Sequence, residues 1–147
     1  MREADAVTKI KTELQKQLPT AVIFKLQDYM TTGIPDLVVN HNRKTIWVEV
    51  KLLKAHETPS SLRKHFDKVQ LATCQLLERQ VHCIYVVVDE DSSELGVYSP
   101  QVISNCLRRK DLNLNIFFNS ASYLDYFDPV IKRLVELVER KEEYFEA

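Results

Sequence analysis

The chain has 147 residues, of which 45% are hydrophobic and 28% charged, and its formal net charge is -1. This length suits one compact domain, so we expect a single domain over residues 1–147. The composition shows no sign of a disordered, collagen-like or coiled-coil protein. Because the whole-chain charge is balanced, any electrostatic argument for a nucleic-acid partner has to come from a local cluster of charges.

The elements follow one another in a mixed α/β order. Helical spacing predicts a helix from about residue 3 that Pro19 ends, and residues 21–26 have the pattern of a strand. Strands at 36–40 and 45–52, joined by 41–44, have the pattern of a hairpin, and a helix over about 62–80 and a strand at 83–89 follow. This order predicts a mixed central sheet flanked by helices.

Beyond residue 90 the patterns are weaker. They predict a strand at 95–98, a short helix at 102–109, a strand at 115–118 and a last helix that contains Val130, Leu134, Leu137 and Val138. An apolar helix of this kind packs on its own core or against a second copy of the chain, so it offers one interface for a homodimer.

The N-terminal residues, the apolar runs and the cysteines favour the cytoplasm. The acidic start leads into a polar helical pattern, whereas a secretory signal needs an apolar core. The longest apolar run, at 84–88, is too short to cross a bilayer, so we expect no membrane segment. Cys74, Cys83 and Cys106 are odd in number and lack CxxC spacing, which predicts reduced, packed thiols.

The strand at 45–52 carries two charges in an apolar setting. Side chains alternate between the two faces of a strand, so Glu49 and Lys51 share one face with Trp47 while the intervening aliphatic residues face a core. Burial of either charge costs several kcal/mol unless it is paired or binds a metal ion. An ordinary surface ion pair is the alternative interpretation of such an isolated Glu-x-Lys pattern.

Asp36 stands at the start of the preceding strand, directly after Pro35. Hairpin pairing would bring Asp36 toward Glu49 and Lys51. Paired carboxylates suit Mg²⁺, which keeps its other positions for water and phosphate oxygens. Such an ion lowers the pKa of a bound water and neutralises charge on a phosphodiester, so the pattern predicts metal-assisted hydrolysis with Lys51 beside the nucleophile.

Gly33-Ile-Pro-Asp36 followed by Trp47-Val-Glu49-Val-Lys51 resembles the active-site signature of the PD-(D/E)XK nuclease superfamily. More narrowly, it is similar to the VRR-NUC and phage Holliday-junction-resolvase-like branch. The resemblance covers about residues 3–90, leaving a C-terminal extension over about 95–147. It implies a restriction-endonuclease-like αβββαβ core, and a metal-dependent endonuclease that acts on branched or structured DNA, often as a dimer.

The resemblance also implies roles for single residues. Asp36, Glu49 and the backbone carbonyl of Val50 would bind Mg²⁺ or Mn²⁺, and Lys51 would serve the attacking water. Gly33 would provide an unusual φ or a close backbone approach in the loop that carries Asp36, although an ordinary turn glycine remains an alternative. The family order further matches, in this chain, Glu3, Lys25 and Gln70.

Each of these last three residues has an alternative interpretation. Glu13 is a rival to Glu3 as the helix carboxylate, and a first-turn Glu also favours the helix dipole without any catalytic role. Lys25 points either into the site or out to solvent. Gln70 either contacts a phosphate or a metal-bound water, or is an ordinary surface residue of its helix.

Basic residues gather around the motif. Residues 41–68 contain seven Lys or Arg against three acidic residues, an excess that suits a phosphate backbone of any sequence. We therefore expect nucleic-acid contacts from Lys25, Lys54, Arg63, Lys64 and Lys68. A non-catalytic nucleic-acid-binding module and an RNA-cleaving enzyme of the same fold are the two alternative functions.

Overall fold

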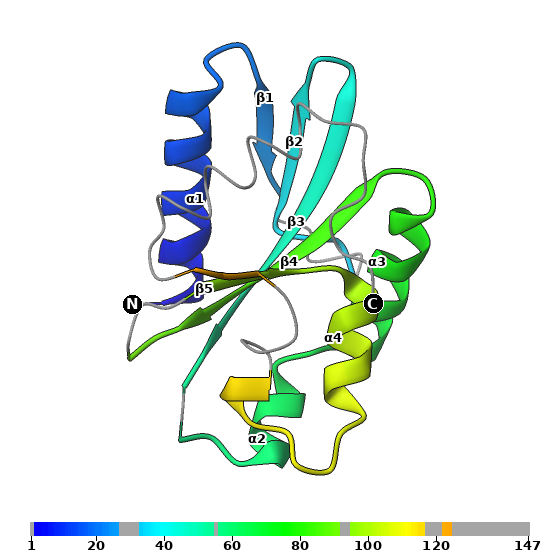
Figure 1. The fold of residues 1–147 in the computed structure, drawn as a ribbon. Coiled ribbons are helices and arrows are strands. Elements are labelled where there is room, and N and C mark those ends of the chain that lie inside the picture. The colour runs from blue at the N-terminus through cyan, green and yellow to red at the C-terminus, as the bar shows by residue number, and fades with distance from the viewer. Residues whose placement is uncertain (1, 27–32, 55, 92–94, 117–121, 125–147) are drawn as a thin grey trace.

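The computed structural model describes residues 2–26, 33–54, 56–91, 95–116 and 122–124. Its elements run, in chain order, α1 (Glu3–Gln17), β1 (Val22–Lys25), β2 (Leu37–His41), β3 (Lys44–Leu53), α2 (Pro59–Lys64), α3 (Lys68–Glu78), β4 (His82–Asp89), β5 (Leu95–Tyr98), α4 (Pro100–Leu107) and β6 (Ser122–Leu124). Figure 1 shows them along the chain. The predicted helix at the N-terminus, the hairpin strands and the strand at 83–89 are confirmed.

The six strands form one mixed sheet in the order β1-β2-β3-β4-β5-β6. All neighbouring strands are antiparallel except β3 and β4, which are parallel. A parallel pair needs a crossover connection, and α2 and α3 provide it between β3 and β4. The mixed α/β architecture predicted from the sequence is therefore confirmed.

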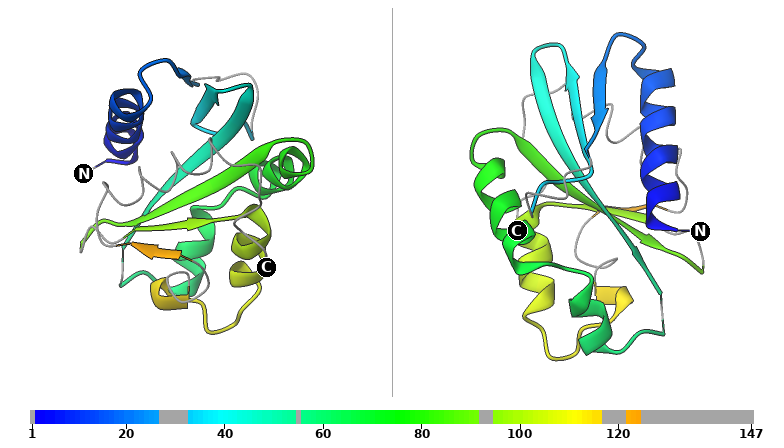
Figure 2. Two further views of the ribbon diagram at one scale, coloured as in Figure 1. Left: turned by 45° about the horizontal axis from the view of Figure 1, so that its top comes forward. Right: turned by 180° about the vertical axis from the view of Figure 1, so that it is seen from behind.

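Helices cover both faces of the sheet, with α1 on one side and α2, α3 and α4 on the other (Figure 2). The first core lies between α1 and the sheet and contains Ile10, Leu14, Val39, Val48, Val50, Val86 and Val97. The second core lies on the opposite face and contains Leu53, Leu62, Phe66, Cys74, Tyr85, Ile103 and Leu114. Residues of β3 alternate between these two cores, so the face that carries Glu49 and Lys51 is also covered.

The β2–β3 hairpin closes through two residues that both have positive φ, Asn42 at 50° and Arg43 at 64°. Two-residue turns of this kind match the twist of the flanking strands, and Asn tolerates the left-handed region better than most residues. The turn fixes the register in which His41 pairs with Lys44 and Leu37 with Val48. This register decides where Asp36 lies along β3.

The prediction of one helix over about 62–80 is wrong, because the structure has two helices there. Thr58 caps α2, whose first residue is Pro59. The carboxylate of Asp67 then accepts hydrogen bonds from the N–H groups of Val69 and Gln70 and starts α3 as a new helix. An Asp side chain satisfies the free N–H groups of a helix start, so a cap at this position interrupts a pattern that otherwise continues.

The strand predicted at 115–118 is also wrong in the part that the structure describes, because residues 114–116 form a helical turn. The side chain of Asn113 accepts a hydrogen bond from the N–H of Ile116 and holds this turn. The predicted last helix around Val130–Val138 lies outside the described residues. Within the described residues, no helix is long and apolar enough to cross a membrane.

Candidate metal and nuclease site

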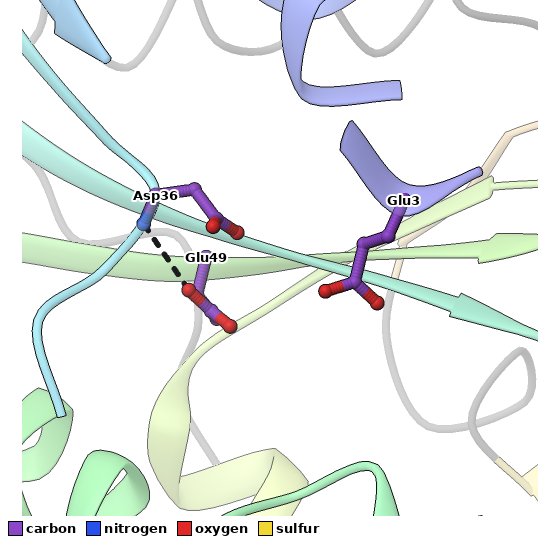
Figure 3. Close-up of side chains that lie close together, drawn as sticks. All are labelled: Glu3, Asp36 and Glu49. Carbon is purple, nitrogen blue, oxygen red and sulfur yellow. Dashed lines mark hydrogen bonds between the residues drawn. The ribbon is translucent and has the colours of Figure 1, made fainter. Parts of the chain in front are cut away.

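Three carboxylates from distant parts of the sequence meet at the edge of β3. One ligand oxygen from each of Glu3, Asp36 and Glu49 lies within 4.8 Å of the other two. Figure 3 shows the three side chains gathered from the start of α1, the residue before β2 and the middle of β3. The predicted approach of Asp36 to Glu49 is therefore observed, and the helix carboxylate that joins them is Glu3.

The edge of β3 explains why the acids gather there. The last β2–β3 pair joins Leu37 to Val48, so the N–H groups of Val50 and Leu52, farther along the same edge, lack a partner strand. Asp36 Oδ2 accepts the Val50 N–H at 2.9 Å, and Glu3 Oε2 accepts the Leu52 N–H at 3.2 Å. The two carboxylates thus accept the hydrogen bonds that the carbonyl groups of a neighbouring strand would otherwise accept.

The backbone around Asp36 is held on both sides. Its N–H donates to Glu49 Oε1 at 3.1 Å, and its carbonyl accepts the N–H of Leu26 at 2.8 Å. The N–H and C=O groups of one strand residue point to the same edge, so the carbonyl of Val50 lies on the edge that carries Asp36. These contacts place two carboxylates and one carbonyl on a single side of β3.

Lys51 lies beside Glu49 on the same face of β3. Its Nζ is 2.9 Å from Glu49 Oε2 and 5.9 Å from the centre of the Phe66 ring. Glu49 is 2% exposed and Lys51 is 7% exposed, so this is a buried ion pair and not the exposed one that was the alternative. Breaking such a pair is costly, because the remaining charge is left buried.

The site favours a bound proton or a cation. Burial raises the pKa of Glu49 to about 8, and the neighbouring charge of Asp36 acts in the same direction, while Lys51 opposes both. For Lys51, burial lowers the pKa, but the adjacent Glu49 carboxylate outweighs it and the net pKa is raised. Both directions follow from placing more carboxylates than amines in a space with little water.

Comparison with known proteins gives matches of structure only. No family model and no curated protein matches the sequence. The archaeal Holliday junction resolvase Hjc of Archaeoglobus fulgidus superposes with a TM-score of 0.50 at 13% identity, covering 84% of this chain and 98% of the resolvase. The chain therefore shares the fold of this resolvase. A VRR_NUC domain matches with a TM-score of 0.39 at 21% identity, over 56% of this chain and 83% of that domain.

Gln70, on α3, lies next to the segment that carries Asp36. Gly33 has a φ of +93°, and a Cβ on it would lie 3.0 Å from Thr73 Oγ1 and 3.3 Å from the Cα of Gln70. The unusual φ expected for this glycine is thus observed, and its close backbone contact is with α3. The Oε1 atom of Gln70 is buried and lacks a hydrogen-bond partner within the described residues.

The other predicted residues are more dispersed. Glu13 is ion-paired with Lys16, at 3.1 Å, and does not join the carboxylate cluster. Lys25 is exposed, and its Nζ donates to Thr8 Oγ1 on α1 at 3.1 Å. The guanidinium of Arg63 donates to the carbonyls of Leu107 and Arg109.

Three predicted lysines are exposed around the crossover between β3 and β4, namely Lys54, Lys64 and Lys68. Lys54 Nζ is 3.6 Å from Glu90 Oε2. The position of Phe66 beside Lys51 was not predicted from the sequence. Asp67, a good N-cap residue, was the available signal for a break at this point.

Proposed function

We propose that the protein is a metal-dependent nuclease that hydrolyses phosphodiester bonds in DNA. The observation that carries this proposal is the convergence of Glu3, Asp36 and Glu49 within 4.8 Å, with Lys51 Nζ 2.9 Å from Glu49. Carboxylate pairs that flank a lysine suit hydrolysis at a phosphodiester, where negative charge has to be neutralised and a water activated.

The residues present fit a divalent cation. Burial and, to a smaller extent, the charge of Asp36 raise the pKa of Glu49. A cation bound among the three carboxylates would offset both effects. The oxygen-only donor set suits a hard ion such as Mg²⁺ or Mn²⁺. The Oε1 atom of Gln70 is buried and has no hydrogen-bond partner within the described residues. A cation-bound water would provide the hydrogen-bond donor that such a buried oxygen requires.

Under this proposal Asp36, Glu49 and the Val50 carbonyl hold the cation, with Glu3 completing the acidic cluster. A bound divalent ion would supply an activated water and neutralise charge on the phosphate. Lys51, fixed between Glu49 and the ring of Phe66, would hold the attacking water in place by hydrogen bonding. Gln70 would orient a second water or contact a phosphate oxygen.

Branched or structured DNA is the substrate proposed from the resemblance to resolvase-like nucleases, together with action as a homodimer in the cytoplasm. Exposed Lys54, Lys64 and Lys68, with Lys25 on β1, would contact the phosphate backbone. An RNA-cleaving enzyme would use the same chemistry. A non-catalytic binding module is disfavoured, since it has no need to bury Glu49 and Lys51 at the cost that such charges carry.

Purified protein incubated with Mg²⁺ or Mn²⁺ and with linear duplex, single-stranded, branched and RNA substrates tests these functions. We expect cleavage of DNA, and at least a hundredfold loss of rate in Asp36→Asn, Glu49→Gln and Lys51→Met, which retain the shapes of the side chains they replace. Glu13→Gln, at a half-buried carboxylate that pairs with Lys16 outside the cluster, should cut like the wild type. Binding without cleavage under every condition would favour the non-catalytic module, and cleavage of RNA alone the RNA-cleaving enzyme.

A further inference from the structure

Tyr85 is a fully buried tyrosine beside the candidate site. It lies in β4, and in the register of the parallel β3–β4 pair its Cα is the partner of the Glu49 Cα. Paired residues on neighbouring strands point to the same face, so Tyr85 shares a side of the sheet with Glu49 and Lys51. Tyr85 also belongs to the second core, which covers that side.

The ring of Phe66 packs against both Tyr85 and Lys51. The centres of the Phe66 and Tyr85 rings are 6.0 Å apart, and the rings are tilted by 46°. The centre of the Phe66 ring is also 5.9 Å from Lys51 Nζ. Tyr85 and the Lys51 ammonium therefore share two neighbours, Glu49 on β3 and Phe66 above the sheet.

The hydroxyl of Tyr85 is buried without a hydrogen-bond partner among the described residues. Cys74 of α3 is near enough to affect the pKa of Tyr85, but a thiol is only a weak hydrogen-bonding group. A buried hydroxyl without a partner destabilises the folded state, and a phenylalanine would place the same ring there without that cost. The hydroxyl therefore suits a contact that forms when the site is occupied.

The Tyr85 hydroxyl carries no charge. Burial raises its pKa, and the neighbouring Cys74 and Glu49 act in the same direction. A neutral hydroxyl accepts a hydrogen bond from an ammonium without cancelling its positive charge. In this respect Tyr85 differs from the carboxylates of Glu3, Asp36 and Glu49.

A divalent cation at the site would change the surroundings of Lys51. Lys51 Nζ lies 2.9 Å from Glu49 Oε2, and an ammonium has three N–H groups. A cation on Glu49 attracts the same carboxylate and repels the ammonium, so it weakens this contact. A neutral acceptor nearby would then hold the ammonium and leave its charge free to act on the attacking water.

We propose that Tyr85 is a positioning residue of the candidate site, whose hydroxyl accepts a hydrogen bond from Lys51 when a cation occupies Glu49. This inference rests on the proposed nuclease function and adds to it a residue that acts through Lys51. Tyr85 is 0% exposed, so it contributes to the rate of cleavage and not to contact with DNA.

The test compares Tyr85→Phe with the wild type in Mn²⁺, on the DNA of the substrate panel that the wild type cuts fastest. We expect kcat to fall by about tenfold, the effect of one lost hydrogen bond, while KM stays unchanged. The affinity for Mn²⁺ alone, measured by calorimetry, should also stay unchanged. In EDTA, Tyr85→Phe should resist urea at least as well as the wild type, because the hydroxyl that it removes has no partner there.

Tyr98→Phe is the matched control. Tyr98 is also 0% exposed and belongs to the same core, but it lies on β5, one strand farther from Glu49, with its ring over Gly96. This variant should cut like the wild type.

A crystal structure of the wild type with Mn²⁺ tests the contact without any cleavage. We expect Lys51 Nζ about 2.7–3.2 Å from the Tyr85 hydroxyl oxygen. A structure with Mn²⁺ bound in which these two atoms do not meet would overturn the inference, even if the protein cuts DNA.

Three results from Tyr85→Phe would also overturn it. An unchanged kcat would leave the hydroxyl without a role in the reaction, and lower stability in EDTA would give it a structural role. A joint loss of kcat and Mn²⁺ affinity would assign it to the cation. Failure of the nuclease proposal shows separately, as a wild type that cuts no DNA, and the Mn²⁺ structure then decides the contact alone.

Discussion

Glu49 is both buried and acidic, and the candidate site needs both properties. It is 2% exposed, and its two oxygens contact Lys51 Nζ and the N–H of Asp36. Because burial raises the pKa of Glu49, this side chain takes up a proton more readily than an ordinary glutamate when no cation is bound. Cation and proton therefore compete for the same oxygens, and the free energy of unfolding should reveal this competition.

Glu49 predicts a pH dependence of stability in the absence of divalent ions. The pKa rises from its ordinary value of 4.5 to about 8 on folding, so the folded state binds the proton more tightly. The stability that Glu49 contributes is fully present below pH 4.5 and is lost as the pH rises through 8. Urea unfolding in EDTA should show a loss on the order of a few kcal/mol between pH 5 and pH 8 relative to Glu49→Gln, which cannot titrate.

The control for this measurement is Glu13→Gln, because Glu13 is ion-paired with Lys16 away from the carboxylate cluster. It should keep the pH slope of the wild type. Addition of Mn²⁺ should remove most of the loss at pH 8, since the ion replaces the proton. Equal slopes in the wild type and in Glu49→Gln would mean that Glu49 ionises as easily in the folded as in the unfolded chain.

At the scale of elements, the segment before β2 depends on Gly33. Its φ of +93° is in a region that other residues rarely adopt, and its Cα faces α3 near Thr73 and Gln70. We expect Gly33→Ala to destabilise the protein by about 1–3 kcal/mol and to slow cleavage, since the segment carries Asp36. Urea unfolding and the cleavage assay would measure both effects.

Two causes contribute to the expected cost at Gly33, and a second substitution separates them. Thr73→Ala removes the hydroxyl that lies 3.0 Å from the added Cβ but leaves the backbone conformation unchanged. The double variant should therefore recover part of the stability lost in Gly33→Ala and retain the part due to φ. If Gly33→Ala is as stable as the wild type, the segment has another conformation of similar energy.

Sequence periodicity and turn chemistry were enough to predict α1, the β2–β3 hairpin and β4. They also placed Asp36 opposite Glu49, because register follows from the alternation of apolar residues and from the position of the turn. The break between α2 and α3 was missed, since apolar spacing continues through it and only the cap at Asp67 marks it. The open edge of β3 that holds Glu3 could not be foreseen, because it depends on where β2 stops pairing, more than thirty residues along the chain from Glu3.

Arg63 links two elements, and its substitution tests whether that is its role. It lies in α2, and its guanidinium donates to two carbonyls at the end of α4 and beyond, those of Leu107 and Arg109. Lysine cannot make both hydrogen bonds, so we expect Arg63→Lys to lose about 1–2 kcal/mol of stability in urea unfolding. Lys64→Ala, at the exposed neighbouring residue, should change stability by less than about 0.5 kcal/mol.

The stability and the DNA affinity of Arg63→Lys together show which role the Arg63 guanidinium has. A variant as stable as the wild type that binds DNA more weakly would assign the guanidinium to a phosphate, as the sequence predicted. A variant that is less stable and binds DNA normally would assign it to the contact between α2 and α4. The DNA measurement should use Arg63→Lys at a temperature where circular dichroism shows it folded.

At the scale of the whole molecule, positive charge has to compensate for a net charge of -1 if the protein is to bind a polyanion. The acids of the candidate site would be neutralised by the cation, and the exposed lysines of the crossover lie on the same side of the sheet as α2 and α3. Affinity for DNA then depends on a few phosphate contacts, each of which releases counterions on binding. Salt dependence is therefore the measurement that counts those contacts.

We expect log K for duplex DNA to fall linearly with log salt concentration, and Lys64→Ala and Lys68→Ala each to reduce the slope by about one. Both side chains are exposed, so their removal should leave the fold intact. Lys16→Ala is the matched control, because Lys16 is also an exposed helix lysine but pairs with Glu13 on α1, across the sheet from α2 and α3. Its slope should equal that of the wild type. An unchanged slope in Lys64→Ala and Lys68→Ala would mean that the phosphate backbone does not contact the crossover. The same salt titration on Lys25→Ala and Arg43→Ala would then test contacts at β1 and at the β2–β3 turn.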